Sequence, residues 1–344
     1  MLVSKGIYHH IRSDVIAMLE AGTLLTEGRG QATRYAYADA ILELGARNPD
    51  VVVLDADVSK SLKTTQFAEA FPERSFNFGI AEQNMMAAAA GMATTGLIPY
   101  ASGYAVFLTM RALDQVRNSI HYPRLNVKIA SSHSGITAGP DGPTHQGQED
   151  LSLMRAIANS IVIAGADTVT TKRATWAAAE WEGPVYLSLT RDPVPDLYDE
   201  SYPFEIGRAV VIREGSDATI VAIRDMVSQA LVAAELLAGR GLSVRVIDCH
   251  TLKPLDEATL LQAAVETGAM VTAESNTIIG GLGSAVAELL VENHPIPMQR
   301  IGVRDTFTES GPYPQILEKY GMSARHIAAA VGKVVERKSL QVAR

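Results

Sequence analysis

The chain has 344 residues, of which 47% are hydrophobic and 20% are charged, and its formal net charge is -8. A chain of this length forms two or three domains of ordinary size. The acidic balance excludes binding to a polyphosphate backbone by counterion release, so we expect no nucleic acid partner.

Short β-branched runs alternate with longer segments of helical period, which is typical of parallel strands joined by helical crossovers. In the first half, strands are predicted at 51–57, 126–132, 161–167 and 185–190, and helices at 33–46, 81–94, 104–121, 147–159 and 168–181. In the second half, strands are predicted at 218–223, 243–249, 269–275 and 299–303, and helices at 226–239, 256–266, 282–292 and 323–337. The expected fold class is therefore α/β, with two consecutive doubly wound domains and mainly parallel sheets.

A proline-rich stretch separates the two series. Pro193, Pro195 and Pro203 break both periodicities and indicate a linker. The expected organisation is a helical extension over 1–30, a first domain over 31–192, a linker over 193–206 and a second domain over 207–344.

Neither a membrane segment nor a disulfide framework is expected. The longest nearly apolar stretch, 85–93, is far shorter than the roughly 20 residues of a membrane-spanning helix. Cys249 is the single cysteine, which excludes an internal disulfide and a four-thiolate zinc site. The first residues lack the apolar core of a signal peptide, and we interpret His9-His10 as a surface pair. Together these features predict a cytoplasmic protein.

Glu82 precedes a helix that is apolar on every face, over residues 85–93. A helix without a polar stripe is buried in a core or at a subunit interface. Glu82 is then either a capping residue in the first turn of this helix or a functional carboxylate. In open α/β sheets ligands collect at the carboxyl ends of strands, which favours the loops there as functional sites.

The polar segment 131–150, SSHSGITAGPDGPTHQGQED, is much longer than the usual connection of about 2–6 residues. Its turns could bring His133, Asp141 and His145 together. A metal site is one interpretation, although the spacing matches no strong zinc motif, and an ordinary exposed loop is another.

Two further sets are candidates for binding. Tyr104, Phe107 and Met110 are spaced by three, as on one helical face, and form either ordinary core or a platform for a ring. The cationic and hydroxyl set consists of Arg34, Ser61 and Arg191. An arginine after a strand end suits a phosphate or carboxylate, but such arginines also pair on the surface.

Two weaker patterns point elsewhere. The glycines of IIGGLGSAV form half of a dinucleotide fingerprint without its third glycine, so a nicotinamide dehydrogenase is disfavoured. Asp55 and Asp57 could bind a metal, but acidic residues at strand ends are common.

Five motifs occur in the order GIAEQN, PYASGYAVF, GPDGPTHQG, LSLTR and DTFTESGPYPQILEKYG. In this combination the chain resembles the transketolase family of thiamine-diphosphate enzymes, specifically its pyrimidine-binding domain followed by its C-terminal domain. The resemblance extends from roughly residue 30 to residue 335. No single motif would be specific, but the ordered set is.

The resemblance implies a role for each candidate. Glu82 looks like the glutamate that hydrogen-bonds N1′ of the cofactor's aminopyrimidine, and Tyr104 and Phe107 match aromatics that pack on that ring. Met110 stands where a third aromatic is common. The expected catalytic residues are Glu82, His145 and Asp141, the last two holding the donor sugar's hydroxyls. The set that matches the substrate phosphate site is Arg34, Ser61, His133 and Arg191, and Asp57 falls on an acidic position near the cofactor.

The family's diphosphate-binding domain carries a GDG motif that holds a divalent cation, and this chain contains no GDG. The resemblance therefore implies the C-terminal subunit of a split transketolase. Its partner would be an N-terminal subunit that holds Mg2+ or Ca2+, in an α2β2 heterotetramer that shares the cofactor between subunits. No metal ligand is expected in this chain itself.

The implied activity is transfer of a two-carbon ketol unit from a ketose phosphate to an aldose acceptor, as in pentose phosphate metabolism. Alternatives within the same fold are a 1-deoxy-D-xylulose-5-phosphate synthase-like subunit and a 2-oxoacid dehydrogenase β-like subunit. A non-catalytic regulatory subunit is the alternative from a different class. The DGPTHQG loop with its flanking histidines favours sugar chemistry over 2-oxoacid chemistry.

Overall fold

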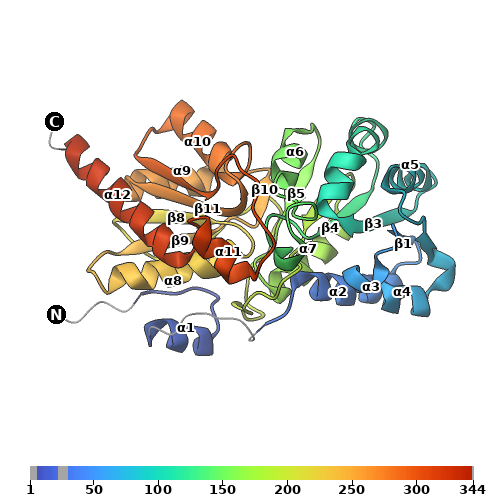
Figure 1. Ribbon diagram of the computed structural model, residues 1–344, viewed down its shortest axis with the longest axis horizontal. Coiled ribbons are helices and arrows are strands. Elements are labelled where there is room, and N and C mark those ends of the chain that lie inside the picture. The colour runs from blue at the N-terminus through green and yellow to red at the C-terminus, as the bar shows by residue number, and fades with distance from the viewer. Residues whose placement is uncertain (1–5, 22–29, 343–344) are drawn as a thin grey trace.

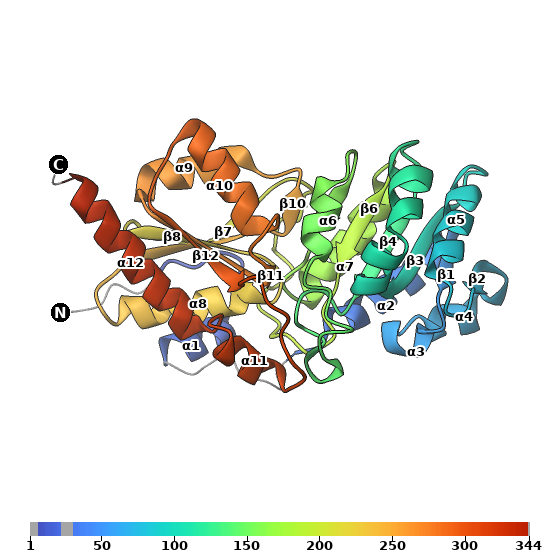
Figure 2. The same ribbon diagram turned by 45° about the horizontal axis from the view of Figure 1, so that its top comes forward.

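The computed structural model describes residues 6–21 and 30–342, which form two α/β bodies lying side by side along the long axis of the molecule (Figure 1). Each body has a central sheet with helices on both faces, as Figure 2 shows most clearly for the first sheet. The expected fold class is confirmed.

The first sheet has seven strands in the order β10-β5-β6-β4-β3-β1-β2. Their bounds are β1 Val51–Asp55, β2 Ser75–Asn77, β3 Ile98–Tyr104, β4 Lys128–Ser132, β5 Ile161–Ile163, β6 Val185–Ser188 and β10 Thr251–Lys253. All pairings are parallel except that of β10, which comes from the second half of the chain and lies antiparallel to β5. In β1 all five residues of VVVLD are buried, as a parallel strand covered on both faces requires.

Two sets of helices cover this sheet. On one face lie α2 (Thr33–Arg47), α4 (Thr65–Ala70) and α7 (Thr168–Glu180). The short helix α3 (Ser59–Leu62) precedes α4 in the chain. On the other lie α5 (Glu82–Ala93), α6 (Asp150–Ala156) and two π-helical segments, Phe107–Arg111 and Gln115–His121. A capping box begins α7, because Thr170 N donates to Asp167 Oδ1 and Asp167 N donates to Thr170 Oγ1.

The second sheet has five strands in the order β12-β11-β8-β9-β7, all parallel except the β7–β9 pair. Their bounds are β7 Val210–Arg213, β8 Ala218–Ala222, β9 Val244–Asp248, β11 Met270–Thr277 and β12 Met298–Val303. One face is covered by α9 (Glu257–Thr267) and α10 (Leu282–Asn293). The other is covered by α1 (Ser13–Glu20), α8 (Met226–Ala238), α11 (Tyr313–Lys319) and α12 (Ala324–Val342).

One hydrophobic cluster contains residues from both sheets. Buried residues of α5 and α6, such as Met85 and Leu151, belong to the same cluster as Leu260 of α9 and Leu282 of α10. The segment between the two halves is also buried, since Tyr198 and Tyr202 both donate from their hydroxyls to Asp248 Oδ2. The two bodies therefore pack tightly against each other.

Several local predictions were wrong or incomplete. The helix expected over 104–121 begins one residue later than predicted, at 105. The central strand before it, β3, was not predicted, because Pro99 and Gly103 conceal its β character from the sequence pattern. Strands β2, β7 and β10 and helices α3, α4 and α11 were not predicted. Of the expected N-terminal helical extension, only Ser13–Glu20 is helical among the described residues, and Tyr8 and Ile11 form β-bridges instead. No helix in the described ranges is long and apolar enough to span a membrane.

Candidate active site

The candidate residues gather at the carboxyl edge of the first sheet. Strands β6, β4, β3 and β1 are neighbours in that sheet. Tyr104 ends β3, His133 follows β4 directly, and Arg191 lies three residues beyond β6. Since parallel strands all end at the same edge, residues far apart in the sequence meet there.

Glu82 is the first residue of α5, and its side chain is only 4% exposed. The positive end of the helix dipole favours a negative charge at this position. Arg111 Nη1 donates to both carboxylate oxygens, at 2.9 Å to Oε1 and 2.8 Å to Oε2. The Arg111 guanidinium also lies over the Phe107 ring, with Cζ 4.2 Å from the ring centroid. The buried carboxylate, the arginine and the aromatic ring therefore form one continuous group.

A cluster of rings extends from Phe107. The Tyr104 ring centroid lies 5.9 Å from that of Phe107 and 3.9 Å from that of His133. The His145 ring stands edge-on to both aromatics, 5.5 Å from Phe107 and 6.0 Å from Tyr104. This cluster joins the aromatic residues to both histidines of the 131–150 loop.

His133 is buried beside two arginines. Burial, together with the positive charges of Arg34 and Arg191, lowers the pKa of His133 to about 3, so the ring is neutral at physiological pH. Its Nε2 lies 3.2 Å from Asp141 Oδ2, a polar contact rather than an ion pair because the imidazole is neutral. The same Asp141 oxygen lies 3.5 Å from Arg191 Nε. His133, Asp141 and Arg191 thus form a connected polar chain.

Arg34 completes a cationic region next to this chain. Its Nη1 donates to Ser61 Oγ at 3.1 Å, while its Nε is buried without a hydrogen-bond partner in the described part of the chain. Burial and the nearby Arg191 guanidinium lower the pKa of Arg34. Two like charges held close together, one with an unpaired donor, favour binding of an anion.

Two predicted site residues do not join the group. Met110 is 37% exposed, and because Tyr104 ends a strand, the row Tyr104, Phe107 and Met110 is not one helical face. Asp57 is exposed and hydrogen-bonded through its backbone and side chain to Asn77. The buried carboxylate at the end of β1 is instead Asp55, whose pKa burial raises to about 6.

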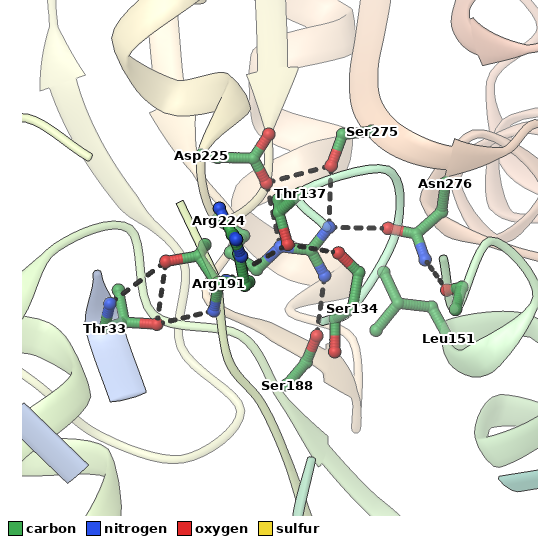
Figure 3. Close-up of polar contacts among 12 residues, drawn as sticks. Thr33, Ser134, Thr137, Leu151, Ser188, Arg191, Arg224, Asp225, Ser275 and Asn276 are labelled. Carbon is green, nitrogen blue, oxygen red and sulfur yellow. Dashed lines mark hydrogen bonds and ion pairs between the residues drawn. The ribbon is translucent and has the colours of Figure 1, made fainter. Parts of the chain in front are cut away.

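The 131–150 loop is held by residues of the second domain, which the sequence did not identify (Figure 3). Arg224, fully buried after β8, donates to Ser188 Oγ at the end of β6 and to Ser275 Oγ in β11, both at 2.6 Å. Asn276 accepts from Arg224 at 2.9 Å and donates to the backbone of the loop at Gly147 O and Gln148 O.

Backbone contacts complete the attachment of the loop. Ile136 N donates to Ser275 O, and Arg191 N donates to Thr137 Oγ1. A Cβ at Gly135, where φ is +59°, would lie 2.5 Å from Arg224 Nη2, so only glycine fits there. The site loop is therefore braced between the two domains.

The described residues contain no group of three or more His, Cys, Asp or Glu side chains that could hold a metal ion. The described residues of the 131–150 loop therefore do not support its interpretation as a metal site. The sequence also did not indicate Arg111, although this residue directly follows Met110, a candidate for cofactor binding.

Family models and relatives match almost the whole chain. The transketolase pyrimidine-binding domain matches residues 29–196, and the transketolase C-terminal domain matches residues 207–327. A 6-deoxy-6-sulfo-D-fructose transketolase subunit of Clostridium sp. (strain MSTE9) is 42% identical over 308 residues, 90% of this chain and 96% of that protein. A putative transketolase C-terminal section of Methanocaldococcus jannaschii is 43% identical over 301 residues, 87% of this chain and 94% of that protein.

A solved structure described as a split-gene transketolase in an inactive β4 tetramer superimposes with a TM-score of 0.83. It is 51% identical in sequence, and the match covers 90% of this chain and 99% of that one. The two family models cover both α/β bodies, and the first of them includes the candidate site residues at the strand ends of the first sheet. The chain therefore belongs to the transketolase family and carries its pyrimidine-binding domain followed by its C-terminal domain.

Proposed function

We propose that the chain is the C-terminal subunit of a two-subunit, thiamine-diphosphate-dependent transketolase, which transfers a two-carbon ketol unit from a ketose phosphate to an aldose acceptor. The observation that carries the proposal is the continuity of the site. A buried carboxylate, Glu82, leads through the Phe107 and Tyr104 rings to the polar chain of His133, Asp141 and Arg191. One end suits a flat heterocycle and the other suits a sugar with a terminal anion.

The residues fit thiamine diphosphate. A carboxylate that is 4% exposed and is linked through Arg111 to an aromatic ring suits an aminopyrimidine that shares a proton with it in a water-poor site. Glu82 would hold that proton at N1′, and Phe107 and Tyr104 would orient the ring by packing. When bound, the cofactor supplies the nucleophilic carbon that attacks the ketose carbonyl.

The sugar end of the site fits a polyhydroxylated substrate. Neutral His133 carries one donor and one acceptor nitrogen, and Asp141 and His145 lie within the same loop to bond hydroxyl groups. Arg34, Ser61 and Arg191 would bind the terminal anion. A phosphate and a sulfonate share the trigonal set of oxygens that such guanidiniums recognise, so both are within the proposed substrate class.

A partner subunit is part of the proposal. Helix α5 buries Met85, Met86 and Ala89 within the chain but exposes the small residues Ala87 and Gly91, next to the polar Gln83 and Asn84 of its first turn. The small apolar area at Ala87 and Gly91, left open in the single chain, supports a subunit contact.

The partner would be an N-terminal subunit carrying the diphosphate-binding domain with its Mg2+ or Ca2+, in an α2β2 assembly. Location in the cytoplasm belongs to the same proposal and is supported by the single, buried Cys249.

The test is reconstitution with such an N-terminal subunit, thiamine diphosphate and Mg2+, followed by a ketol-transfer assay on a panel of phosphorylated and sulfonated ketoses. Glu82→Gln is expected to lower the rate by about 100-fold or more, the usual size of a general acid–base contribution. Glu336→Gln, which removes an exposed carboxylate on α12, is the matched control. If Glu82→Gln retains near wild-type ketol transfer, the assigned role of Glu82 is wrong.

The same preparation separates the alternatives. A 2-oxoacid dehydrogenase β-like subunit or a 1-deoxy-D-xylulose-5-phosphate synthase-like subunit would consume pyruvate, whereas a transketolase would cleave ketoses. A non-catalytic regulatory subunit would do neither in any reconstituted complex. Pyruvate consumption without ketose cleavage would therefore overturn the proposed activity.

A further inference from the structure

The Arg111 side chain makes two contacts that a flat heterocyclic cofactor would need for itself. Its Nη1 occupies both oxygens of Glu82, at 2.9 and 2.8 Å, and its guanidinium covers the Phe107 ring at 4.2 Å. A guanidinium is planar, stacks on aromatic faces and donates N–H groups to carboxylates. In shape and bonding it thus resembles one edge of an aminopyrimidine.

The local backbone explains how Arg111 reaches this place. Phe107 and Arg111 are the first and last residues of one π-helical segment, four positions apart. Residues with this spacing lie one above the other on a helix, which places the guanidinium over the ring. Single π-helical turns of this kind occur frequently at functional sites.

The two ends of the contact differ in exposure. The Glu82 side chain is 4% exposed, whereas the Arg111 side chain is 45% exposed. A buried carboxylate without a partner is strongly unfavourable, so Arg111 stabilises Glu82 in the chain by itself. Because the arginine reaches in from the solvent side on a long flexible stem, it can withdraw to water without disturbing the core.

From this geometry we propose that Arg111 is a placeholder that occupies the aminopyrimidine position of the isolated site and is displaced when the cofactor binds. The proposal rests on the proposed function, in which Glu82 and Phe107 receive the cofactor ring. It makes Arg111 a positioning residue, because it acts by holding the Glu82 carboxylate through two hydrogen bonds until the ring arrives. It also predicts that the arginine competes with the cofactor.

Competition has a measurable form. If only the fraction of molecules with Arg111 withdrawn can bind, the apparent dissociation constant is the intrinsic one divided by that fraction. Removing the competing side chain therefore tightens binding. Removing the side chain also changes the kinetics of binding. In the wild type, the withdrawal of Arg111 limits the association rate at high cofactor concentration, and a variant without the arginine has no such limit.

The experiment measures binding rather than turnover. Thiamine diphosphate with Mg2+ is titrated into the complex of the chain and its N-terminal partner by calorimetry, and the association rate is followed by stopped-flow fluorescence. Arg111→Met is expected to bind about five- to tenfold more tightly, and its association rate should rise linearly where the wild-type rate saturates. Arg240→Met, which removes an exposed positive charge after α8, should behave as wild type.

Each outcome is decisive. Unchanged or weaker binding by Arg111→Met, with wild-type binding intact, would overturn the placeholder role and leave the proposed function standing. Failure of the wild-type complex to bind thiamine diphosphate would instead refute the proposed function. Should Arg111→Met not assemble with the partner, Arg111→Gln keeps a polar side chain at the surface and is expected to show the same tightening.

Discussion

Replacing Arg224 by methionine is expected to lower the free energy of unfolding by about 3–5 kcal/mol, the usual cost of leaving one member of a buried ion pair without its partner. The Arg224 side chain is fully buried, and the Asp225 side chain, which accepts from Arg224 Nε at 2.8 Å, is 1% exposed. Methionine keeps an unbranched apolar side chain but has no donor, so Asp225 would remain buried with an uncompensated charge.

Further contacts add to this cost. The guanidinium also donates to Ser188, Ser275 and Asn276, all of which are buried. The backbone of Arg224 is left-handed, with φ at 54°, and this strain persists in methionine. Glycine adopts a positive φ without strain. Arg224→Gly should therefore destabilise the protein less than the loss of the whole side chain alone would suggest.

The measurement is urea unfolding followed by circular dichroism, on Arg224→Met, Asp225→Asn and the double variant. Removing both charges costs less than leaving one of them buried alone. The double variant should therefore lose less unfolding free energy than the two single variants lose in sum, by at least about 1 kcal/mol. If the effects are additive, or if Arg224→Met alone costs less than about 1 kcal/mol, Arg224 does not brace the domains as described.

Three other predictions concern the anion site, the loop and the pH dependence of stability. Arg34→Met should raise KM about 10- to 100-fold for donors with a terminal phosphate or sulfonate and leave KM nearly unchanged for donors without one, measured in the reconstituted complex; equal effects on both would contradict an anion site. Gly135→Ala should cost about 1–3 kcal/mol in urea unfolding, since its Cβ would lie 2.5 Å from Arg224 Nη2 and its φ is +59°; a neutral result would show that the loop can shift away. Burial raises the pKa of Asp248 from 3.8 to about 7, so the folded protein keeps a proton that the unfolded chain loses above its own pKa. The resulting stability is fully present below pH 4 and declines by up to about 1.4 kcal/mol per pH unit as the pH rises towards 7. The wild type should therefore lose stability relative to Asp248→Asn across this window in unfolding titrations, and a constant difference would refute the raised pKa.

The sequence predicted those strands whose burial shows as a β-branched run, such as 51–55 and 218–222. It did not predict β3, because a central strand made of small residues, Pro99, Gly103 and tyrosines has no β-branched pattern, although its five inner residues are buried. The short β10 depends on pairing with β5, a strand about 90 residues earlier, and such long-range pairing leaves no local signal.

The candidate site was predictable where its residues lie at strand ends. His133, Asp141, His145 and Arg191 were identified from loop position and motif, and the structure brings them together. The residues that support them were not identifiable. Arg224 belongs to the other domain, and only the folded topology places it beneath the 131–150 loop.

Strand β10 links the two domains through the main chain as well as through side chains. By pairing with β5, it continues the first sheet with chain from the second domain, through main-chain hydrogen bonds. Such bonds do not depend on side-chain identity, so substitutions on either surface leave this main-chain link in place. Within the described residues, the link opposes a hinge motion at this junction. Changes in substrate preference during divergence would have to come from the loops at the strand ends, while the frame that carries them stays rigid.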